Sequence, residues 1–322
     1  MSPYWGVSFF EFFVVFVKRL FSGDITNLAT DEIQMIVLSC IAISCALVGP
    51  FLVLKKMAMF ANSLSHTILI GIVMAFLLCG KEGMFDLTHL VVGSLCAAVF
   101  TALCTEGLVK YFRLTEDASV GLIFTFLFAS GILLVTLFMR DVHLGIESVM
   151  GNADALLLSD VKTSLSLAVL NGGVIFLFYR HFQLSSFDRN FAQVLGLPGN
   201  IFHFLLLFLV AITCTGAFRA VGVLLVLAFL VGPYLTVRLF CHRLPFILVW
   251  SCVVGVGISF CGVALTRHIL SVYDLPLSTG GMVVCIIGLT YFLALCVKKM
   301  KISLFKDLLY LLSSKKTLKA PI

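Results

Sequence analysis

The sequence predicts an all-α, polytopic membrane protein of about nine transmembrane helices, within a range of eight to ten. Of its 322 residues, 61% are hydrophobic and only 12% are charged, and the mean hydropathy is +1.14. A soluble domain of this length carries about 25% charged residues. Apolar windows of about 20 residues, each long enough to cross about 30 Å of hydrocarbon, recur along the whole chain. They lack the alternating pattern of the ~10-residue strands of a membrane β-barrel.

By composition the chain divides into three parts. Residues 1–32 hold an aromatic stretch followed by a polar linker, and an interfacial helix is favoured there over a full crossing. Residues 33–297 form the transmembrane domain, and residues 298–322 form a basic tail. The sixth and seventh spans are separated only by the region around Arg219, which predicts a tight hairpin or a broken helix. The nine predicted spans are 33–54, 60–79, 87–110, 119–139, 161–181, 201–217, 219–241, 245–266 and 279–297.

Basic residues predict the orientation of these spans. Fifteen of the 22 Lys and Arg residues, seven of them in the tail, fall on one side of the predicted topology, and seven fall on the other. The richer side is expected to be cytoplasmic, so the N-terminus faces out and the C-terminus faces in. The same short basic clusters explain the net charge of +6 without a nucleic-acid partner; the expected surroundings are membrane lipid.

Several chemistries are not indicated by the motifs present. The eleven cysteines include no Cys-x-x-Cys pair and mostly lie in apolar runs, where cysteine behaves as a small hydrophobic residue. No G-x-x-x-x-G-K-[ST] motif occurs, so ATP, if it is used, would be bound by another chain. We expect no permanently bound cofactor and no enzymatic activity, since no nucleophile–base set accompanies the apolar runs.

The most informative polar residues are Asn62 and His66, in the second span. They are four residues apart, so on a helix they share one face about 6 Å apart. His66 lies ten residues after Lys56 in the charged elbow of Lys55 and Lys56, about 15 Å along that helix. Ionisable residues inside a membrane commonly serve function, although a histidine that only locks helix packing is the alternative. Imidazole suits Mn, Fe and Zn, so if the chain moves a cation across the bilayer, His66 and Asn62 are the first candidates for a transient metal contact.

Other polar residues have structural explanations. Glu106 is predicted to pair with Lys110, one turn later, as a helix-end ion pair. His89 and His203 lie near span ends, where an interfacial or hydrogen-bonded histidine is expected, and Arg219 is predicted to anchor the outer interface. The outward loop 140–160 could attract cations or dock an extracytoplasmic partner, or simply be solvated; its acidic residues are Asp141, Glu147, Asp154 and Asp160.

The inward connection 183–200 predicts a short amphipathic helix parallel to the membrane. Asp188 can cap it, Phe191, Ala192 and Leu195 would share an apolar face, and Gly196 with Pro198 would end it. A motor protein could grip such a helix; an ordinary surface helix is the alternative.

Four blocks of the sequence resemble the permease subunits of bacterial ABC importers for manganese, zinc and iron. They are GPFLVLKKMAMFANSLSHTILIG (49–71), EDASVGLIFTFLFASGILL (116–134), FDRNFAQVLGLP (187–198) and AVGVLLVLAFLVGPYLTVRLF (220–240). The chain departs from the family pattern in two places. Asn62 replaces an aspartate four residues before the histidine, and Ile70 replaces a proline after it.

This resemblance implies a type II ABC importer permease in the bacterial inner (plasma) membrane. Its implied partners are a cytoplasmic ABC ATPase, an extracytoplasmic metal-binding protein that faces loop 140–160, and a second permease chain. It also implies that the ATPase contacts Phe187, Asp188, Phe191, Ala192, Leu195 and Gly196. Because Asn62 lacks the carboxylate, we expect the second permease chain to be a different paralogue that retains it.

Two other functions stay open from the residues. A siderophore or cobalamin permease would share the architecture but would need a wide vestibule and would not use His66. A secondary cation/proton transporter would use His66 and Glu106 as proton carriers, but no clear inverted repeat supports it. Histidine and asparagine serve Mn, Zn and Fe alike, so the residues do not choose among these metals.

Overall fold

The fold is a bundle of α-helices, seen in a computed structural model that describes residues 9–22, 29–83, 87–138, 152–187 and 199–317. Within these residues all regular structure is helical, which confirms the predicted class. Eight of the helices are long and apolar enough to cross a membrane. The helices are α1 (Phe9–Ser22), α2 (Thr30–Leu54), α3 (Ala58–Gly83), α4 (Leu87–Phe112), α5 (Glu116–Phe138), α7 (Leu158–Phe187), α9 (Gly199–Val221), α10 (Val223–Arg238), α11 (Leu244–Tyr273) and α12 (Thr279–Thr317).

All nine predicted spans correspond to helices, from α2 to α12. The shortest is α10, with 16 residues, and it is the one apolar helix below the length of the eight spanning candidates. The break between the sixth and seventh spans falls at Gly222, slightly later than predicted. This residue has φ of 88°, a conformation that glycine adopts without the steric cost that a Cβ atom would bring.

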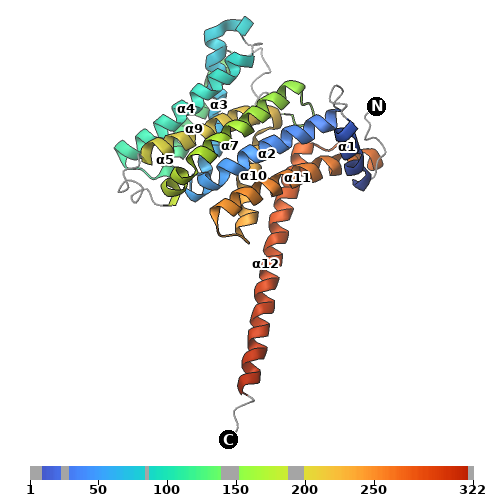
Figure 1. Cartoon of the computed structure of the whole chain (residues 1–322). Helices are drawn as coiled ribbons and strands as arrows, with labels where there is room; N and C mark the ends of the chain where they lie inside the picture. Colours follow the sequence, from blue (N-terminus) through green and yellow to red (C-terminus); the bar gives the residue numbers. More distant parts are fainter. Residues whose placement is uncertain (1–8, 23–28, 84–86, 139–151, 188–198, 318–322) are drawn as a thin grey trace.

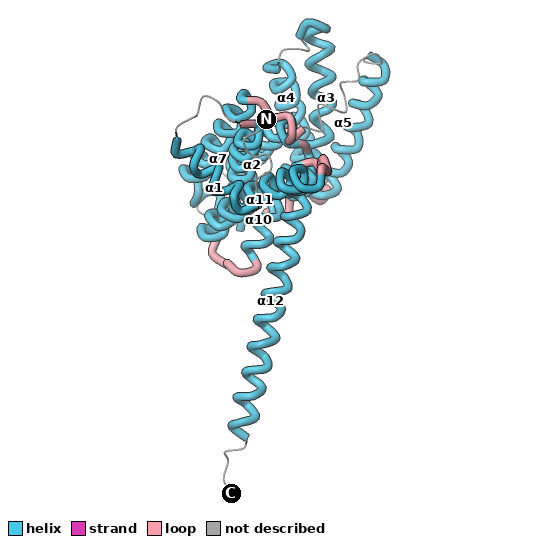
Figure 2. Tube along the Cα trace, turned by 90° about the vertical axis from the view of Figure 1, so that its right-hand side faces the viewer, coloured by secondary structure: helices cyan, strands magenta, loops and turns pink. Residues whose placement is uncertain are grey.

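Helix α2 lies at the centre of the molecule, and the other helices are arranged around it (Figure 1). It packs against α7, α10 and α11, and its Met35, Leu38, Ile41 and Phe51 side chains are fully buried. Helices α3, α4 and α5 pack mainly on one another and join the rest through α9. Seen from the side, α3, α4 and α5 extend in one direction from the bundle and α12 extends in the opposite direction (Figure 2).

Small residues let several helix backbones approach closely. At the crossing of α3 and α4, a Cβ atom on Gly71 would lie 2.4 Å from the carbonyl oxygen of Gly93, so neither position accepts a larger side chain without movement. In α11, Gly262 packs against Val283 of α12 and Gly255 packs against Ala42 of α2. Gly255 and Gly262 therefore permit close packing, whereas Gly257 has open space around it.

A buried polar cluster ties three helices together in the apolar core. Asn171 of α7 is fully buried, and its side-chain amide donates hydrogen bonds to Ser44 of α2 and to Thr213 of α9, the latter at 2.7 Å. Thr213 in turn donates to the carbonyl oxygen of Leu209 at 2.6 Å. In a medium without water these hydrogen bonds fix the relative register of α2, α7 and α9, because breaking one of them leaves a polar group without a partner.

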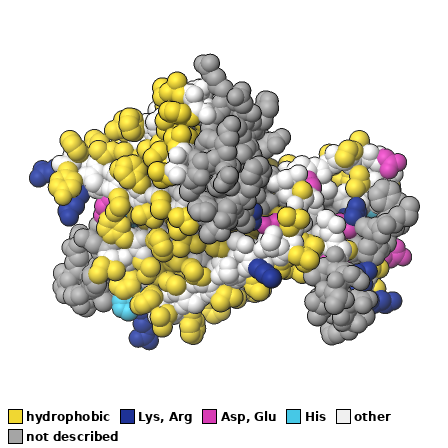
Figure 3. All heavy atoms as spheres, turned by 90° about the horizontal axis from the view of Figure 1, so that it is seen from above, with side chains coloured by type: hydrophobic (Ala, Val, Ile, Leu, Met, Phe, Trp, Pro, Cys, Tyr) yellow, Lys and Arg dark blue, Asp and Glu magenta, His cyan; other side chains and the backbone are white. Residues whose placement is uncertain are grey.

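The outer surface of the bundle is apolar. On the face seen in Figure 3, hydrophobic side chains cover much of the described surface, and most of the visible acidic side chains lie toward one end of the bundle. Helix α12 continues to Thr317, well beyond the predicted last span of 279–297, and carries the C-terminus far from the bundle (Figure 1). With eight spanning helices and this surface, the chain is a multi-pass membrane protein.

Candidate functional site

A tight elbow joins α2 to α3, the helix that carries Asn62 and His66. The amide of Met57 donates to the carbonyl oxygen of Leu52 and that of Lys56 to Val53, both at 3.0 Å, which is the Schellman pattern of a helix end. Lys56 takes the position that is usually glycine, with φ of 61°. The turn thus closes within three residues. It leaves Lys55 half-buried at the end of α2, while Lys56 is exposed and α3 begins at Ala58.

His66 and Asn62 lie on α3, one helical turn apart, and both are half-buried. His66 lies eight residues into the helix, about 12 Å from its start at 1.5 Å per residue. Its ring packs between Phe124 and Phe128 of α5, at centroid distances of 5.1 and 5.0 Å. The side chain of Ser65 hydrogen-bonds the Asn62 carbonyl oxygen at 2.6 Å, so the backbone there is satisfied locally. The two phenyl rings orient the imidazole and leave part of it accessible.

No group of three or more His, Cys, Asp or Glu side chains suited to a metal ion occurs within the described part of the chain. Asn62 and His66 can therefore offer a metal one amide oxygen and one imidazole nitrogen from this chain. Such a pair would hold an ion weakly, which suits a conduction pathway better than a storage site.

A second polar cluster lies at the same end of the bundle as the elbow. We call it the elbow cluster; it comprises Lys55 of the α2 end, Glu106 of α4, Ser185 of α7 and His203 of α9. His203 is 5% exposed and its Nε2 lies 2.8 Å from a carboxylate oxygen of Glu106. The Lys55 ammonium lies 3.4 Å from His203 Nδ1 and donates to Ser185 at 3.2 Å.

This cluster corrects one prediction and confirms another. Glu106 bonds His203 across the bundle, so the pairing with Lys110 that we predicted is not the contact that the described structure records. The expectation that His203 is hydrogen-bonded holds. The His203 ring lies between a cation at Nδ1 and a carboxylate at Nε2.

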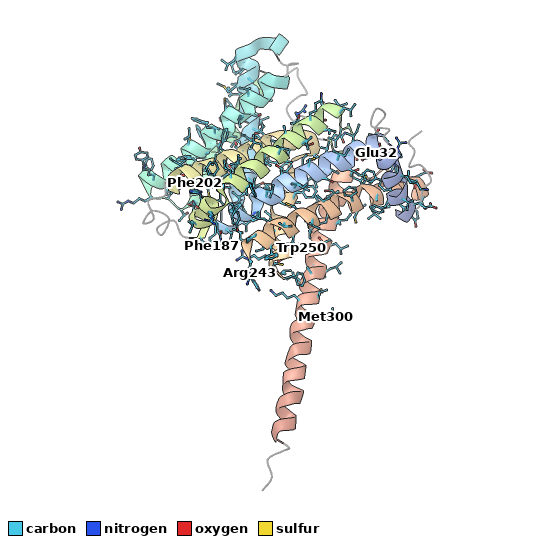
Figure 4. The ribbon with its side chains drawn as sticks, in the orientation of Figure 1. Glu32, Phe187, Phe202, Arg243, Trp250 and Met300 are labelled. Atoms are coloured by element: carbon cyan, nitrogen blue, oxygen red, sulfur yellow. The ribbon has the colours of Figure 1, made fainter. Side chains whose placement is uncertain are left out.

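Aromatic rings pack beside the elbow cluster and limit its contact with surrounding solvent. The ring of Phe202 stacks on His181 at 4.6 Å and meets Phe182 edge-on at 6.0 Å, and Phe182 also packs against Phe51 of α2 at 5.6 Å. Phe202 and Phe187 lie at the elbow end of the bundle, and Glu32 lies at the opposite end, which we call the Glu32 end (Figure 4).

Ion pairs fasten the Glu32 end. Asp31 pairs with Arg267 of α11, Glu32 pairs with Arg19 of α1 at 2.7 Å, and Asp160 pairs with Arg219 at 2.6 Å. Arg219, predicted as an interface anchor, thus binds the acidic residue at the start of α7. Asp154 accepts hydrogen bonds from the backbone and side chain of Thr279, at the start of α12. An open pocket of about 480 Å³ has Asp31, Asp154, Arg267 and Thr279 in its lining.

Several residues singled out in the sequence lie outside the described structure. These are the acidic Asp141 and Glu147 and the coupling residues Asp188, Phe191, Ala192, Leu195 and Gly196, and the side chain of His89 is likewise outside. Phe187 is described: it ends α7 and is 65% exposed.

Sequence reasoning missed the elbow cluster and the aromatic rings around His66. Glu106 and His203 were both predicted near the same-side ends of their spans, and this shared depth was the available indication that they could meet. Phe124 and Phe128 lie in one of the four blocks that carry the family resemblance, but nothing in their spacing pointed to His66.

The fold and the site together define a helical multi-pass membrane protein with polar residues inside its bundle. The chain belongs to the ABC 3 transport family, whose family model matches residues 31–298. The resemblance drawn from the four sequence blocks is thereby confirmed.

Relatives along most of the chain agree. A "probable metal transport system membrane protein" of Chlamydia muridarum is 43% identical over 293 residues, covering 90% of this chain and 93% of that protein. The manganese transport system membrane protein MntD of Bacillus subtilis is 34% identical, covering 67% of this chain and 76% of the relative. The chelated iron transport system membrane protein YfeD of Yersinia pestis is 33% identical, with 80% and 82% covered.

Among solved structures, the chain is similar to PsaBC from Streptococcus pneumoniae in complex with Fab. The TM-score is 0.69 at 20% sequence identity, and the match covers 86% of this chain and 95% of that one. At this identity the likeness supports the fold, which is that of an ABC transporter permease.

Proposed function

We propose that this chain is the membrane-spanning permease subunit of an ATP-driven importer of a divalent metal ion, manganese, zinc or iron. Relatives that carry the names of manganese and chelated iron transport systems support the substrate class. The observation that carries the proposal is His66, an accessible imidazole held by Phe124 and Phe128 about 12 Å inside α3.

The metal passes His66 and Asn62 as transient ligands. Imidazole nitrogen binds all three metals, and the neutral amide adds an oxygen without the charge that would hold the ion tightly. Weak binding favours transport because an ion must leave as readily as it enters. A second permease chain, a paralogue with a carboxylate at the position of Asn62, supplies the stronger half of the pathway.

The remaining parts of the importer are separate chains. A cytoplasmic ABC ATPase grips the connection after α7, through Phe187, Asp188, Phe191, Ala192, Leu195 and Gly196, and an extracytoplasmic binding protein delivers metal near loop 140–160. In this arrangement the elbow end faces the cytoplasm and the Glu32 end faces outward, with the chain in the bacterial inner membrane. The exposure of Phe187, 65%, leaves it available for such a contact. ATP-driven alternating access then moves the metal inward.

The test is uptake of radioactive manganese, zinc and iron by cells that carry His66→Ala, His66→Phe or the native chain. His66→Phe keeps a ring between Phe124 and Phe128 but removes the ligand, so it separates metal contact from packing. We expect both variants to lose about tenfold in uptake rate, the change that 1.4 kcal/mol produces. His242→Phe is the matched control, because His242 is an exposed histidine between α10 and α11.

Normal metal uptake by His66→Phe would show that the histidine only packs. Uptake of a siderophore or cobalamin in place of free metal would assign the chain to that class of permease. Uptake that continues without the ATPase would favour a secondary transporter.

A further inference from the structure

The elbow cluster brings together residues of four helices. Two of these residues lie on either side of the connection 188–198 in the sequence. Ser185 is near the end of α7, three residues before Asp188, and His203 is in α9, five residues after Pro198. Both flanks of the connection 188–198 therefore bond to Lys55. Lys55 begins the elbow that leads directly into α3, the helix of Asn62 and His66.

The geometry points to a coupling relay: Lys55, His203 and Glu106 are positioning residues that transmit movement of the α7 and α9 ends to helices α3 and α4. This inference rests on the proposed function for its direction, since the ATPase would act on the connection 188–198. It assigns a role to three ionisable residues that do not touch the transported ion.

The low exposure of His203 and Glu106 keeps the contacts of the elbow cluster from exchanging with water. His203 is 5% exposed, and the side chain of Glu106 is 17% exposed. A half-buried carboxylate and a half-buried ammonium on either side of one buried imidazole cannot exchange partners for water at low cost, so the helices that carry them move together. Glu106 bonds His203 at 2.8 Å, which ties α4 to α9 by a charge-assisted contact.

The elbow connects Lys55 to the first turn of α3. Because Lys56 and Met57 bond back to Val53 and Leu52, the chain has no slack between Lys55 and the first turn of α3. A displacement of Lys55 is therefore carried into α3, and Asn62 follows seven residues later.

The first experiment measures metal uptake and ATP hydrolysis together in liposomes that contain the assembled importer. We expect Lys55→Met and Glu106→Gln to lower the metal transported per ATP by about fivefold while hydrolysis continues. Lys55→Arg retains a cation and should keep the native ratio. Lys56→Met is the matched control, because this exposed neighbour loses the same charge outside the cluster. Uptake and hydrolysis that fall in parallel, or an unchanged ratio, would overturn the relay.

The second experiment needs no transported ion. A nitroxide amino acid is placed at Phe187 or at Met59, two exposed positions at the end of α7 and the start of α3. In the native complex ATP should change the spectrum at both positions. In Glu106→Gln the change should persist at Phe187 and disappear at Met59, whereas Lys110→Gln, an exposed change on the same helix, should preserve both.

Loss of the nucleotide response at both positions in Glu106→Gln, or at neither, would overturn the relay. The same holds if ATP leaves Phe187 unaffected in the native complex. If the native complex carries none of the three metals, the proposed function is wrong, and the nitroxide spectra still decide whether the cluster couples the two ends.

Discussion

Asn62 is the residue at which this chain departs most from the pattern it resembles. It lies one turn before His66 on α3 and is half-buried. An amide oxygen carries only a partial charge, so it binds a divalent cation less strongly than a carboxylate does at the same distance. In the proposed pathway, Asn62 would therefore hold a metal beside His66 less firmly than an aspartate would.

Changing Asn62→Asp should strengthen metal binding at this position. In a complex built with two copies of this chain, we expect the substitution to raise metal uptake several-fold, because it restores the carboxylate that a paralogue would supply. Uptake rate against metal concentration is the measurement, and Ser63→Asp, a neighbouring carboxylate on another face, is the control. A complex with only this native permease that transports metal at full rate would contradict the need for a paralogue.

The side chain of His66 also illustrates what local sequence cannot specify. Its position inside an apolar run is visible from the sequence, and so is its distance from Asn62. Its neighbours Phe124 and Phe128 are more than fifty residues away in sequence, and only the packing of α3 on α5 brings them to the ring. The Glu106–His203 contact is missing from the sequence analysis for the same reason, since local periodicity suggested Lys110 instead.

At the scale of elements, the contact between α3 and α4 is the closest constraint on the helix that carries His66. Gly71 and Gly93 face one another so tightly that their backbones touch. In a membrane, where apolar helices gain little by leaving lipid, this type of close packing is a main source of helix association.

We expect Gly71→Ala to destabilise the protein by about 1–3 kcal/mol, because the added methyl group overlaps the Gly93 carbonyl and forces the helices apart. Gly107→Ala on α4 is the control, since nothing lies within 4 Å of the position that its Cβ would take. Thermal unfolding in detergent checks both variants. Equal midpoints for Gly71→Ala and Gly107→Ala would mean that the crossing is looser than described.

The helices themselves were largely predictable. A run of about 20 apolar residues in lipid must satisfy its own backbone, and the α-helix does so within one segment. The ends of the helices were less predictable. Helix α11 continues to Tyr273, seven residues after the predicted 266, and the next residue, Asp274, has a left-handed conformation. Helix α12 continues to Thr317. At these ends polar residues remain helical because water, like lipid, tolerates a helix whose backbone bonds are complete.

At the scale of the whole molecule, the number of crossings fixes which sides the two termini occupy. With α10 counted beside the eight spanning candidates, the described helices would make an odd number of crossings, which agrees with the proposed placement of the termini on opposite sides. Helix α10 measures about 24 Å, less than the ~30 Å of hydrocarbon. It packs against α2, α11 and α12.

Reporter fusions test this topology. A green fluorescent protein fused after Ile322 should fluoresce, and alkaline phosphatase at the same point should be inactive, because the basic tail is expected in the cytoplasm. Phosphatase inserted at 145, in the outward loop, should be active. An active phosphatase at the C-terminus would reverse the orientation, and equal results at both sites would require an even number of crossings between them.

The contact between Gly71 and Gly93 is the point at which α3 and α4 cross, and it divides each helix into two arms. His66 lies five residues from Gly71, about 7.5 Å, and Glu106 lies thirteen residues from Gly93, about 20 Å, toward the same end of the bundle. If the two helices turn as one body about this crossing, a shift at Glu106 is reduced about 2.6-fold at His66 by these arm lengths. A displacement of a few ångströms at the elbow cluster becomes one of about 1 Å at the histidine. That is small against the width of a helix but several times the ~0.2 Å tolerance of a metal–ligand bond, so under the proposed function it would be enough to release an ion from His66.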